Sequence, residues 1–164
     1  MDQLRHIDGK NVLLVISGGI AAYKALDLIR RLRERGAAVR CILTKGGQRF
    51  ITPLAVASLS EEKVYTDLWS LTDEQEMGHI RLTRTADAVI VAPASANLIA
   101  KLAHGHADDL ASTALLASNR PILLAPAMNV EMWRNAATQD NIAKLRQRGM
   151  LLVGPDSGEL ACGE

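Results

Sequence analysis

The sequence is poor in aromatic residues and has no excess of charge of either sign. Aromatic side chains make up 3% of the 164 residues, so Ala, Val, Ile and Leu must build the core of a chain that is 48% hydrophobic. The 19 basic and 18 acidic residues almost cancel, so the chain lacks the basic excess typical of nucleic-acid-binding proteins. No apolar run approaches the roughly 20 residues that a membrane-spanning helix needs. We therefore predict a globular protein whose partners include neither nucleic acid nor a membrane.

Cysteine is scarce as well. Cys41 and Cys162 are the only two cysteines, and no cysteines and histidines share the spacing of a metal site. His104 and His106 flank Gly105 without a carboxylate-rich cluster beside them, which favours a turn at a helix end. Residues 1–10 are polar and lack the apolar segment of a signal peptide. We expect no metal and a cytoplasmic protein with reduced thiols.

Apolar segments alternate with helical patterns along the whole chain. Strands are expected at residues 11–17, 38–44, 63–65, 88–92, 121–126 and 150–153. Several are apolar without alternation, as in strands that are buried on both faces of a parallel sheet. The sequence therefore predicts one α/β domain, with a Rossmann-like, doubly wound parallel sheet of about six strands in a three-layer α/β/α arrangement.

The strand at residues 88–92 leads into the turn Pro-Ala-Ser-Ala-Asn. Pro93 is expected to end this strand, because proline donates no ladder hydrogen bond. Ser95 and Asn97 both offer side-chain caps to a helix that begins near Leu98.

Other local signals predict caps, breaks and core positions. Residues 48–60 favour a helix interrupted at Pro53, and residues 67–77 favour a surface loop. Asp108 or Asp109 is expected to begin the next helix. Cys41 lies inside an apolar strand and is expected to pack in the core.

Four of the expected strands end in small or polar residues. These ends are residues 17–19 (Ser-Gly-Gly), 44–46 (Thr-Lys-Gly), 93–97 and 126–129 (Pro-Ala-Met-Asn). Ligands of open α/β sheets bind at the carboxyl ends of the strands, and a glycine turn that opens a helix offers amides to an anion. The glycine turn is not GxGxxG, so a dinucleotide fingerprint is absent. Four such tips on one sheet edge indicate a ligand site.

These motifs resemble those of the homo-oligomeric flavin-containing cysteine decarboxylases. The matching segments are residues 17–24 (SGGIAAYK), 78–80 (GHI), 92–97 (APASAN), 125–129 (APAMN), 132–133 (MW) and 160–164 (LACGE). They follow the family's order over essentially the whole chain, and the combination of Pro-Ala-Met-Asn with Ala-Cys-Gly is specific. Within the family, the phosphopantothenoylcysteine decarboxylases are most similar, particularly the N-terminal half of a bacterial bifunctional protein of coenzyme A biosynthesis.

The resemblance implies a flavoprotein-like fold with FMN held at the strand tips. The matching cofactor positions are Ser17, Gly18, Gly19, Ile20, Thr44, Ser95, Ala96, Asn97, Leu98 and Met128. The physical requirements agree, because a phosphate needs amides and hydroxyls, while a flat ring needs close backbone approach without large side chains.

The implied reaction is the decarboxylation of phosphopantothenoylcysteine to phosphopantetheine, through a thioaldehyde and an ene-thiol and without a metal. His79 matches the catalytic histidine, which acts as an acid or base or orients the substrate. Asn129 matches the residue that holds the substrate carboxylate. Cys162 matches the cysteine that protonates the ene-thiol, and Ala161 lies beside it in the substrate-binding motif.

Taken without the resemblance, the same residues have plainer interpretations. His79 fits a helix start or a surface position, Asn129 fits a helix N-cap, and Cys162 fits an incidental free thiol. Two other functions also stay open: a peptidyl-cysteine decarboxylase, and a flavin-binding regulatory subunit without catalysis. A flavin prenyltransferase is disfavoured by Cys162 and by residues 126–129.

The resemblance also predicts assembly and extent. It implies homotrimers, or dodecamers built from them, with the flavin site at a subunit boundary. In the family, the Ala-Cys-Gly-Glu motif continues into a flap over the substrate, and in the bifunctional protein a synthetase domain follows. We therefore expect residues 1–164 to be a single FMN-binding decarboxylase domain, truncated before both.

Overall fold

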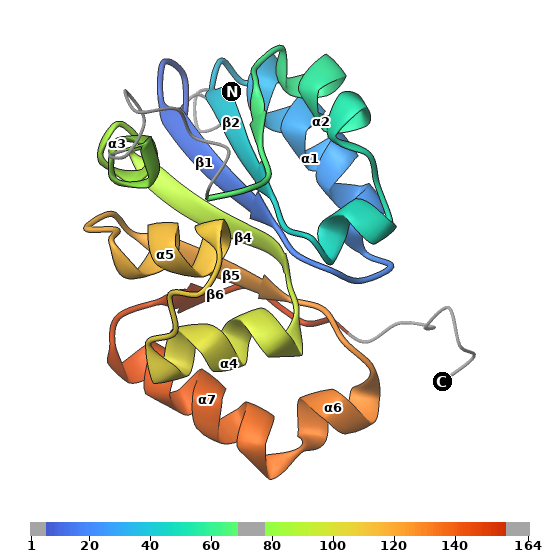
Figure 1. Ribbon diagram of the computed structural model, residues 1–164, viewed down its shortest axis with the longest axis vertical. Coiled ribbons are helices and arrows are strands. Elements are labelled where there is room, and N and C mark those ends of the chain that lie inside the picture. Colours follow the sequence, from blue (N-terminus) through green and yellow to red (C-terminus); the bar gives the residue numbers. More distant parts are fainter. Residues whose placement is uncertain (1–5, 69–77, 157–164) are drawn as a thin grey trace.

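The computed structural model describes residues 6–68 and 78–156 and shows a single parallel sheet (Figure 1). Its strand order is β3-β2-β1-β4-β5-β6, and every neighbouring pair is parallel. The strands are β1 (Asn11–Ile16), β2 (Ala38–Leu43), β3 (Val64–Tyr65), β4 (Ala88–Ala94), β5 (Ile122–Pro126) and β6 (Leu151–Leu152). The predicted six-stranded doubly wound sheet is therefore confirmed.

Helices cover both faces of the sheet, which confirms the three layers. They are α1 (Ala22–Glu34), α2 (Pro53–Ser60), α3 (Gly78–Arg84), α4 (Ala96–His104), α5 (Leu110–Leu116), α6 (Val130–Arg134) and α7 (Ala136–Gln147), with a 3₁₀ turn at Gly47–Arg49. One face packs under α1 and α2, and the opposite face packs under α3, α4, α5 and α7.

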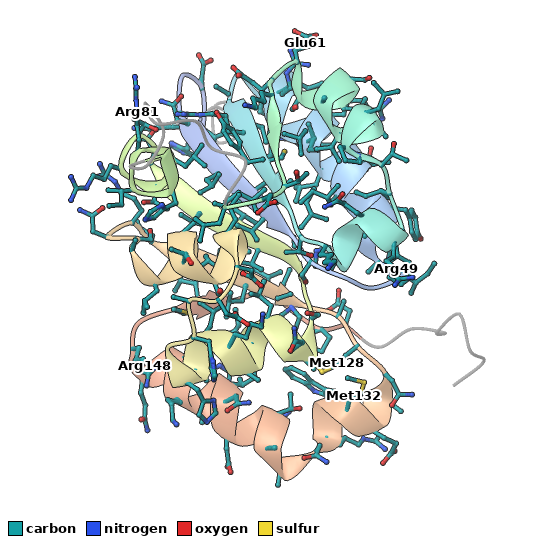
Figure 2. All side chains as sticks on the ribbon, viewed as in Figure 1. Arg49, Glu61, Arg81, Met128, Met132 and Arg148 are labelled. Carbon is teal, nitrogen blue, oxygen red and sulfur yellow. The ribbon has the colours of Figure 1, made fainter. Side chains whose placement is uncertain are left out.

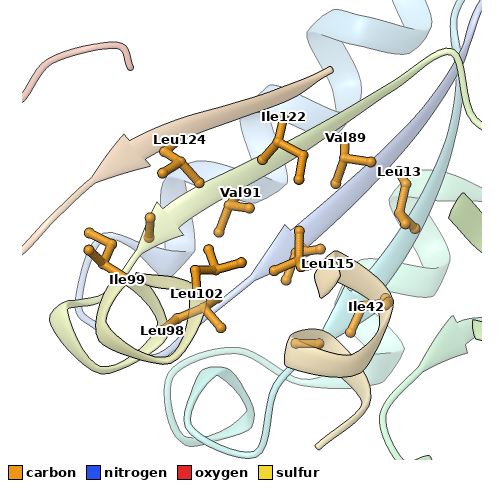
Figure 3. Close-up of a cluster of buried hydrophobic side chains, with 14 of the residues drawn as sticks. Leu13, Ile42, Val89, Val91, Leu98, Ile99, Leu102, Leu115, Ile122 and Leu124 are labelled. Atoms are coloured by element: carbon orange, nitrogen blue, oxygen red, sulfur yellow. The ribbon is translucent and has the colours of Figure 1, made fainter. Parts of the chain in front are cut away.

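Strand β1 shows why the apolar segments lack alternation. Leu13 and Val15 belong to the core under α4 and α5, whereas Leu14 and Ile16 belong to the core under α1. Figure 3 shows Leu13 in the first of these cores. All four side chains are buried, so both faces of the strand need apolar residues. The neighbouring β1 and β4 send their following helices to opposite faces, which places a topological switch point between the two strands.

The end of β4 differs from the prediction. Pro93 does not end the strand, because β4 continues to Ala94, which pairs with Pro126 after a register shift that begins at Val91. Proline is tolerated there because its missing N–H falls within the irregular part of the ladder. The Pro93 carbonyl still takes part, accepting the backbone N–H of Ser17 at 3.2 Å.

The start of α4 also corrects one predicted cap. The helix begins at Ala96 rather than near Leu98, and Ser95 is its N-cap, accepting the Leu98 N–H at 3.2 Å. Asn97 is exposed within the first turn, so the cap prediction is confirmed for Ser95 and wrong for Asn97.

Several other local predictions are confirmed. The break at Pro53 separates the 3₁₀ turn from α2, whose N-cap is Thr52. Gly105 ends α4 in a left-handed conformation, with His104 Nδ1 2.9 Å from the Ala100 carbonyl oxygen.

Residues 69–77, which make up most of the predicted loop, lie outside the described residues. In residues 6–68 and 78–156, no helix is long and apolar enough to span a membrane, and no group of three or more His, Cys, Asp and Glu could hold a metal.

Candidate functional site

The four strand tips predicted to form a site lie next to one another. The sheet order places the ends of β2, β1, β4 and β5 consecutively, at the edge where α1 and α4 begin (Figure 1). The Thr44 N–H donates to the Ile16 carbonyl at 3.0 Å, and the Ala127 N–H donates to the Ala94 carbonyl at 3.1 Å. These bonds make the tips one continuous backbone surface.

Ser17 joins the tips of β1 and β4. Its hydroxyl donates to the Pro93 carbonyl at 2.5 Å and accepts the Ser95 N–H at 2.8 Å. The residue is 2% exposed, so these bonds are shielded from water. A direct contact between Ser17 and a cofactor stays a prediction.

Two glycines allow the tips of β1 and β2 to approach each other closely. A Cβ on Gly18 would lie 3.1 Å from the backbone of Gly46, and a Cβ on Gly46 would lie 3.3 Å from the Gly18 Cα. These distances are tighter than ordinary van der Waals contact, so any larger residue would push the two turns apart. Thr44 Oγ1 accepts the Gly47 N–H at 3.0 Å and holds the second turn in place.

The start of α4 suits an anion. Ser95 Oγ accepts the Leu98 N–H, but within the described part of the chain no acceptor is found for the N–H groups of Ala96 and Asn97. Unsatisfied amides at a helix N-terminus attract a phosphate. The Leu98 side chain is buried in the core, so it offers a ligand at this surface only its backbone.

Apolar side chains flank this polar surface. Ile20 is 60% exposed directly after the glycine turn. Met128 is half-buried against the core, and Met132 is 48% exposed at α6, near Met128 (Figure 2). Amides for a phosphate beside exposed apolar groups and bare backbone fit the two ends of a flavin nucleotide.

Asn129 is the N-cap of α6, as predicted for this residue without the family resemblance. Its Oδ1 accepts the N–H of Glu131 at 2.8 Å and of Met132 at 3.3 Å. The cap uses Oδ1, whereas a hydrogen bond to a carboxylate would use Nδ2, the donor atom of the group. The cap and the predicted carboxylate contact are therefore compatible.

The other predicted catalytic residues are not joined to the strand tips by any described contact. His79 is half-buried in the first turn of α3, and its Nδ1 is buried without a hydrogen-bond partner among the described residues. Cys162 and Ala161 lie outside the described residues. The roles of all three stay predictions.

Sequence reasoning missed Lys101, which pairs with two carboxylates beside a pocket at the tip of β2. Its Nζ lies 2.9 Å from Asp108 Oδ1 and 2.8 Å from Asp109 Oδ2, while Asp109 caps α5, as predicted, through the Ser112 N–H. The hydrogen bond from Lys101 lowers the pKa of Asp108 below its usual value. Both carboxylates line a pocket of about 420 Å³ that also reaches Thr44. The partners of Lys101 are seven and eight residues away across a turn, where helical spacing gives no signal.

Cys41 lies in the core of β2, as predicted. It is fully buried under α1, and this burial raises the pKa of its thiol to about 12. A thiol in this environment stays protonated and does not act as a nucleophile.

A family model described as Flavoprotein matches residues 1–164. The chain belongs to the flavoprotein family.

Curated relatives of this flavoprotein include bifunctional proteins. The coenzyme A biosynthesis bifunctional protein CoaBC of Vibrio vulnificus is 50% identical over 161 residues, which are 98% of this chain and 40% of that protein. The protein of the same name from Escherichia coli K12 is 51% identical over 95% of this chain and 38% of its own length. The chain thus spans about two fifths of the curated relatives that it matches.

Solved structures share the fold. A PPC decarboxylase variant complexed with pantothenoylaminoethenethiol is 32% identical and has a TM-score of 0.83, covering 94% of this chain and 87% of that chain. The FMN binding protein AtHal3 is 34% identical and has a TM-score of 0.81, covering 94% of this chain and 85% of that chain. These similarities agree with the family resemblance of the motifs at the strand tips.

Proposed function

We propose that this flavoprotein binds FMN and decarboxylates phosphopantothenoylcysteine to phosphopantetheine, a step of coenzyme A biosynthesis. The observation that carries the proposal is the continuous surface formed by the tips of β2, β1, β4 and β5, with open amides at one end and Asn129 at the other. Identity of about half to bifunctional proteins of coenzyme A biosynthesis supports this substrate over a peptide.

The residues at the tips fit FMN in two ways. The amides of Ala96 and Asn97, with the Gly18 turn, suit the phosphate, because they offer donors and close backbone approach. Ile20 and Met128 offer apolar surface to the ring. Thr44, Ser95 and Gly19 complete the set of tip residues that the proposal assigns to the cofactor.

When bound, FMN supplies two-electron redox chemistry at the substrate thiol. In this proposal, Asn129 Nδ2 donates a hydrogen bond to the substrate carboxylate. A neutral amide orients that group without the ion pair that would oppose its loss as carbon dioxide. His79 orients the substrate or moves a proton, and Cys162 donates a proton to the carbon skeleton after the carboxylate has left.

The proposal includes self-association into homotrimers in the cytoplasm, with the flavin site at a subunit boundary. Large apolar side chains are exposed beside the strand tips, including Ile20 and Tyr23 at the start of α1 and Phe50 after the 3₁₀ turn. Exposed apolar groups that gather on one side of a protein favour association with another subunit.

The experiment combines flavin binding with turnover. Purified protein is titrated with FMN and followed by flavin absorbance, and carbon dioxide release is then measured from phosphopantothenoylcysteine and from a peptide that ends in cysteine. We expect FMN binding and carbon dioxide release from the first substrate only. In Cys162→Ser we expect carbon dioxide release to persist and phosphopantetheine formation, measured by chromatography, to be lost, because Cys162 acts after the carboxylate has left. A protein that binds no FMN contradicts the cofactor assignment, and release from the peptide alone contradicts the substrate.

A further inference from the structure

Ser17 connects segments that are far apart in the sequence. Its hydroxyl bonds to Pro93 and Ser95, which follow it by 76 and 78 residues. The Pro93 carbonyl also accepts the Ser17 N–H, so it keeps one donor if the hydroxyl is removed. The Ser95 N–H, by contrast, has the Ser17 hydroxyl as its acceptor among the described residues. Ser17 is only 2% exposed. Water therefore cannot replace a hydrogen bond of its hydroxyl unless the surrounding structure changes.

Ser95, in turn, sets the start of α4. Its side chain accepts the Leu98 N–H at 3.2 Å, and its carbonyl accepts the Ile99 N–H at 2.9 Å. The backbone between these two bonds carries the N–H groups of Ala96 and Asn97, for which the described residues provide no acceptor. The direction of this amide pair therefore depends on Ser95, whose own N–H is held by Ser17.

We infer that Ser17 is a positioning residue that aims the Ala96 and Asn97 amides at the phosphate of FMN. It acts through Ser95 and not through a contact of its own with the cofactor, because both hydrogen bonds of its hydroxyl are made within the protein. This inference rests on the proposed flavin site. It predicts that Ser17 controls the preference for FMN over riboflavin, which lacks the phosphate.

The test measures the dissociation constants of FMN and riboflavin for wild type, Ser17→Ala and Ser17→Cys. In Ser17→Ala we expect the FMN constant to rise about tenfold, the equivalent of one net hydrogen bond, while the riboflavin constant stays within about twofold. Ser17→Cys replaces the hydroxyl with a slightly larger thiol that is a weaker donor and acceptor, so its FMN constant should fall between those of wild type and Ser17→Ala. The matched control is Ser60→Ala, because Ser60 is another buried serine, 3% exposed, and ends α2 near the amino end of β2.

Hydrogen exchange of the apoprotein gives a readout that does not need flavin. We expect faster exchange in Ser17→Ala for the amides of residues 95–99, with exchange in α7 unchanged. Equal weakening of both flavins, or unchanged exchange at residues 95–99, overturns the inference. If wild type binds neither flavin, the proposed function fails, and the exchange result still decides whether Ser17 holds the start of α4.

Discussion

Asn129 caps α6 through Oδ1, whereas its proposed contact with the substrate uses Nδ2, so mutation can separate the two roles. Asp keeps an oxygen that can cap α6, whereas Ala removes the cap. We expect the free energy of unfolding of Asn129→Asp to lie within a few tenths of a kcal/mol of the wild-type value. For Asn129→Ala we expect it to fall by about 1 kcal/mol. Both should lose product formation by roughly 10- to 100-fold, because each lacks the Nδ2 donor toward the carboxylate.

Thermal unfolding and carbon dioxide release, measured on the same preparations, check this prediction. The control is Asn135→Ala, which removes a comparable cap from α7, where Asn135 Oδ1 accepts the Ala137 N–H at 2.9 Å. It should lower stability and leave turnover unchanged. Wild-type turnover in Asn129→Asp would show that the cap alone explains this residue.

At the residue scale, the sequence predicts which residue types stand at the tips but not which of their atoms meet a ligand. Ser95 and Asn97 are both acceptable caps by composition, and the choice between them depends on where the β4 backbone turns. The Ser17 hydroxyl is predicted at the site but faces Pro93 and Ser95, which only the parallel pairing of β1 with β4 brings close. Such contacts between distant segments leave no trace in local spacing.

At the element scale, Lys101 links α4 to the turn that begins α5. Its hydrogen bond to Asp109 raises the pKa of Lys101, and its hydrogen bond to Asp108 lowers the pKa of that carboxyl. Burial raises the pKa of Asp109, but the bonds from Lys101 and Ser112 outweigh burial, and the net pKa is lowered. A carboxyl with a lowered folded-state pKa stabilises the protein above its unfolded pKa, near 4, and this stabilisation is lost as the pH falls through the folded pKa.

We therefore expect Lys101→Met to lower Tm by about 2–4 °C at pH 7. The difference from wild type should shrink as the pH falls below about 4, because both carboxyls become protonated and the ion pairs disappear. Calorimetry from pH 7 to pH 3 checks this. Lys144→Met, at an exposed position of α7, is the control and should show no such pH dependence. A Tm difference that stays constant down to pH 3 contradicts the ion-pair explanation.

Elements were more predictable than their ends. Periodicity predicts the apolar strands and the amphipathic helices, and their alternation along the chain predicts the doubly wound parallel sheet, whereas the strand order comes from the structure. The end of β4 was not predictable, because proline excludes only a ladder N–H, and the partner strand decides whether that N–H is needed. The pairing of Ala94 with Pro126 is thus a tertiary effect.

At the scale of the whole molecule, one half of the sheet has an apolar face that no element of residues 6–68 and 78–156 covers. Ile90, Leu123 and Leu151 are neighbours in register on β4, β5 and β6, on the side that α1 and α2 cover over β1 and β2. Ile90 and Leu123 are only half-buried, and Leu151 is 59% exposed. Parallel sheets are normally covered on both faces, so we expect the proposed homotrimer to bury this half-sheet in addition to apolar residues beside the strand tips.

Leu151→Glu tests this assignment, because a carboxylate placed against an apolar subunit surface carries a large desolvation cost. We expect the wild type to sediment as a trimer or a multiple of it, and Leu151→Glu to sediment as a monomer with an unchanged far-ultraviolet circular dichroism spectrum. Ala143→Glu introduces the same charge at an exposed position of α7 and should leave assembly intact.

Wild-type assembly in Leu151→Glu would place the subunit contact elsewhere, with the exposed apolar residues Ile20, Tyr23 and Phe50 as the surface to test next. Because the proposed flavin site lies at a subunit boundary, a monomeric Leu151→Glu should also bind FMN more weakly, which couples assembly to the cofactor in one measurement.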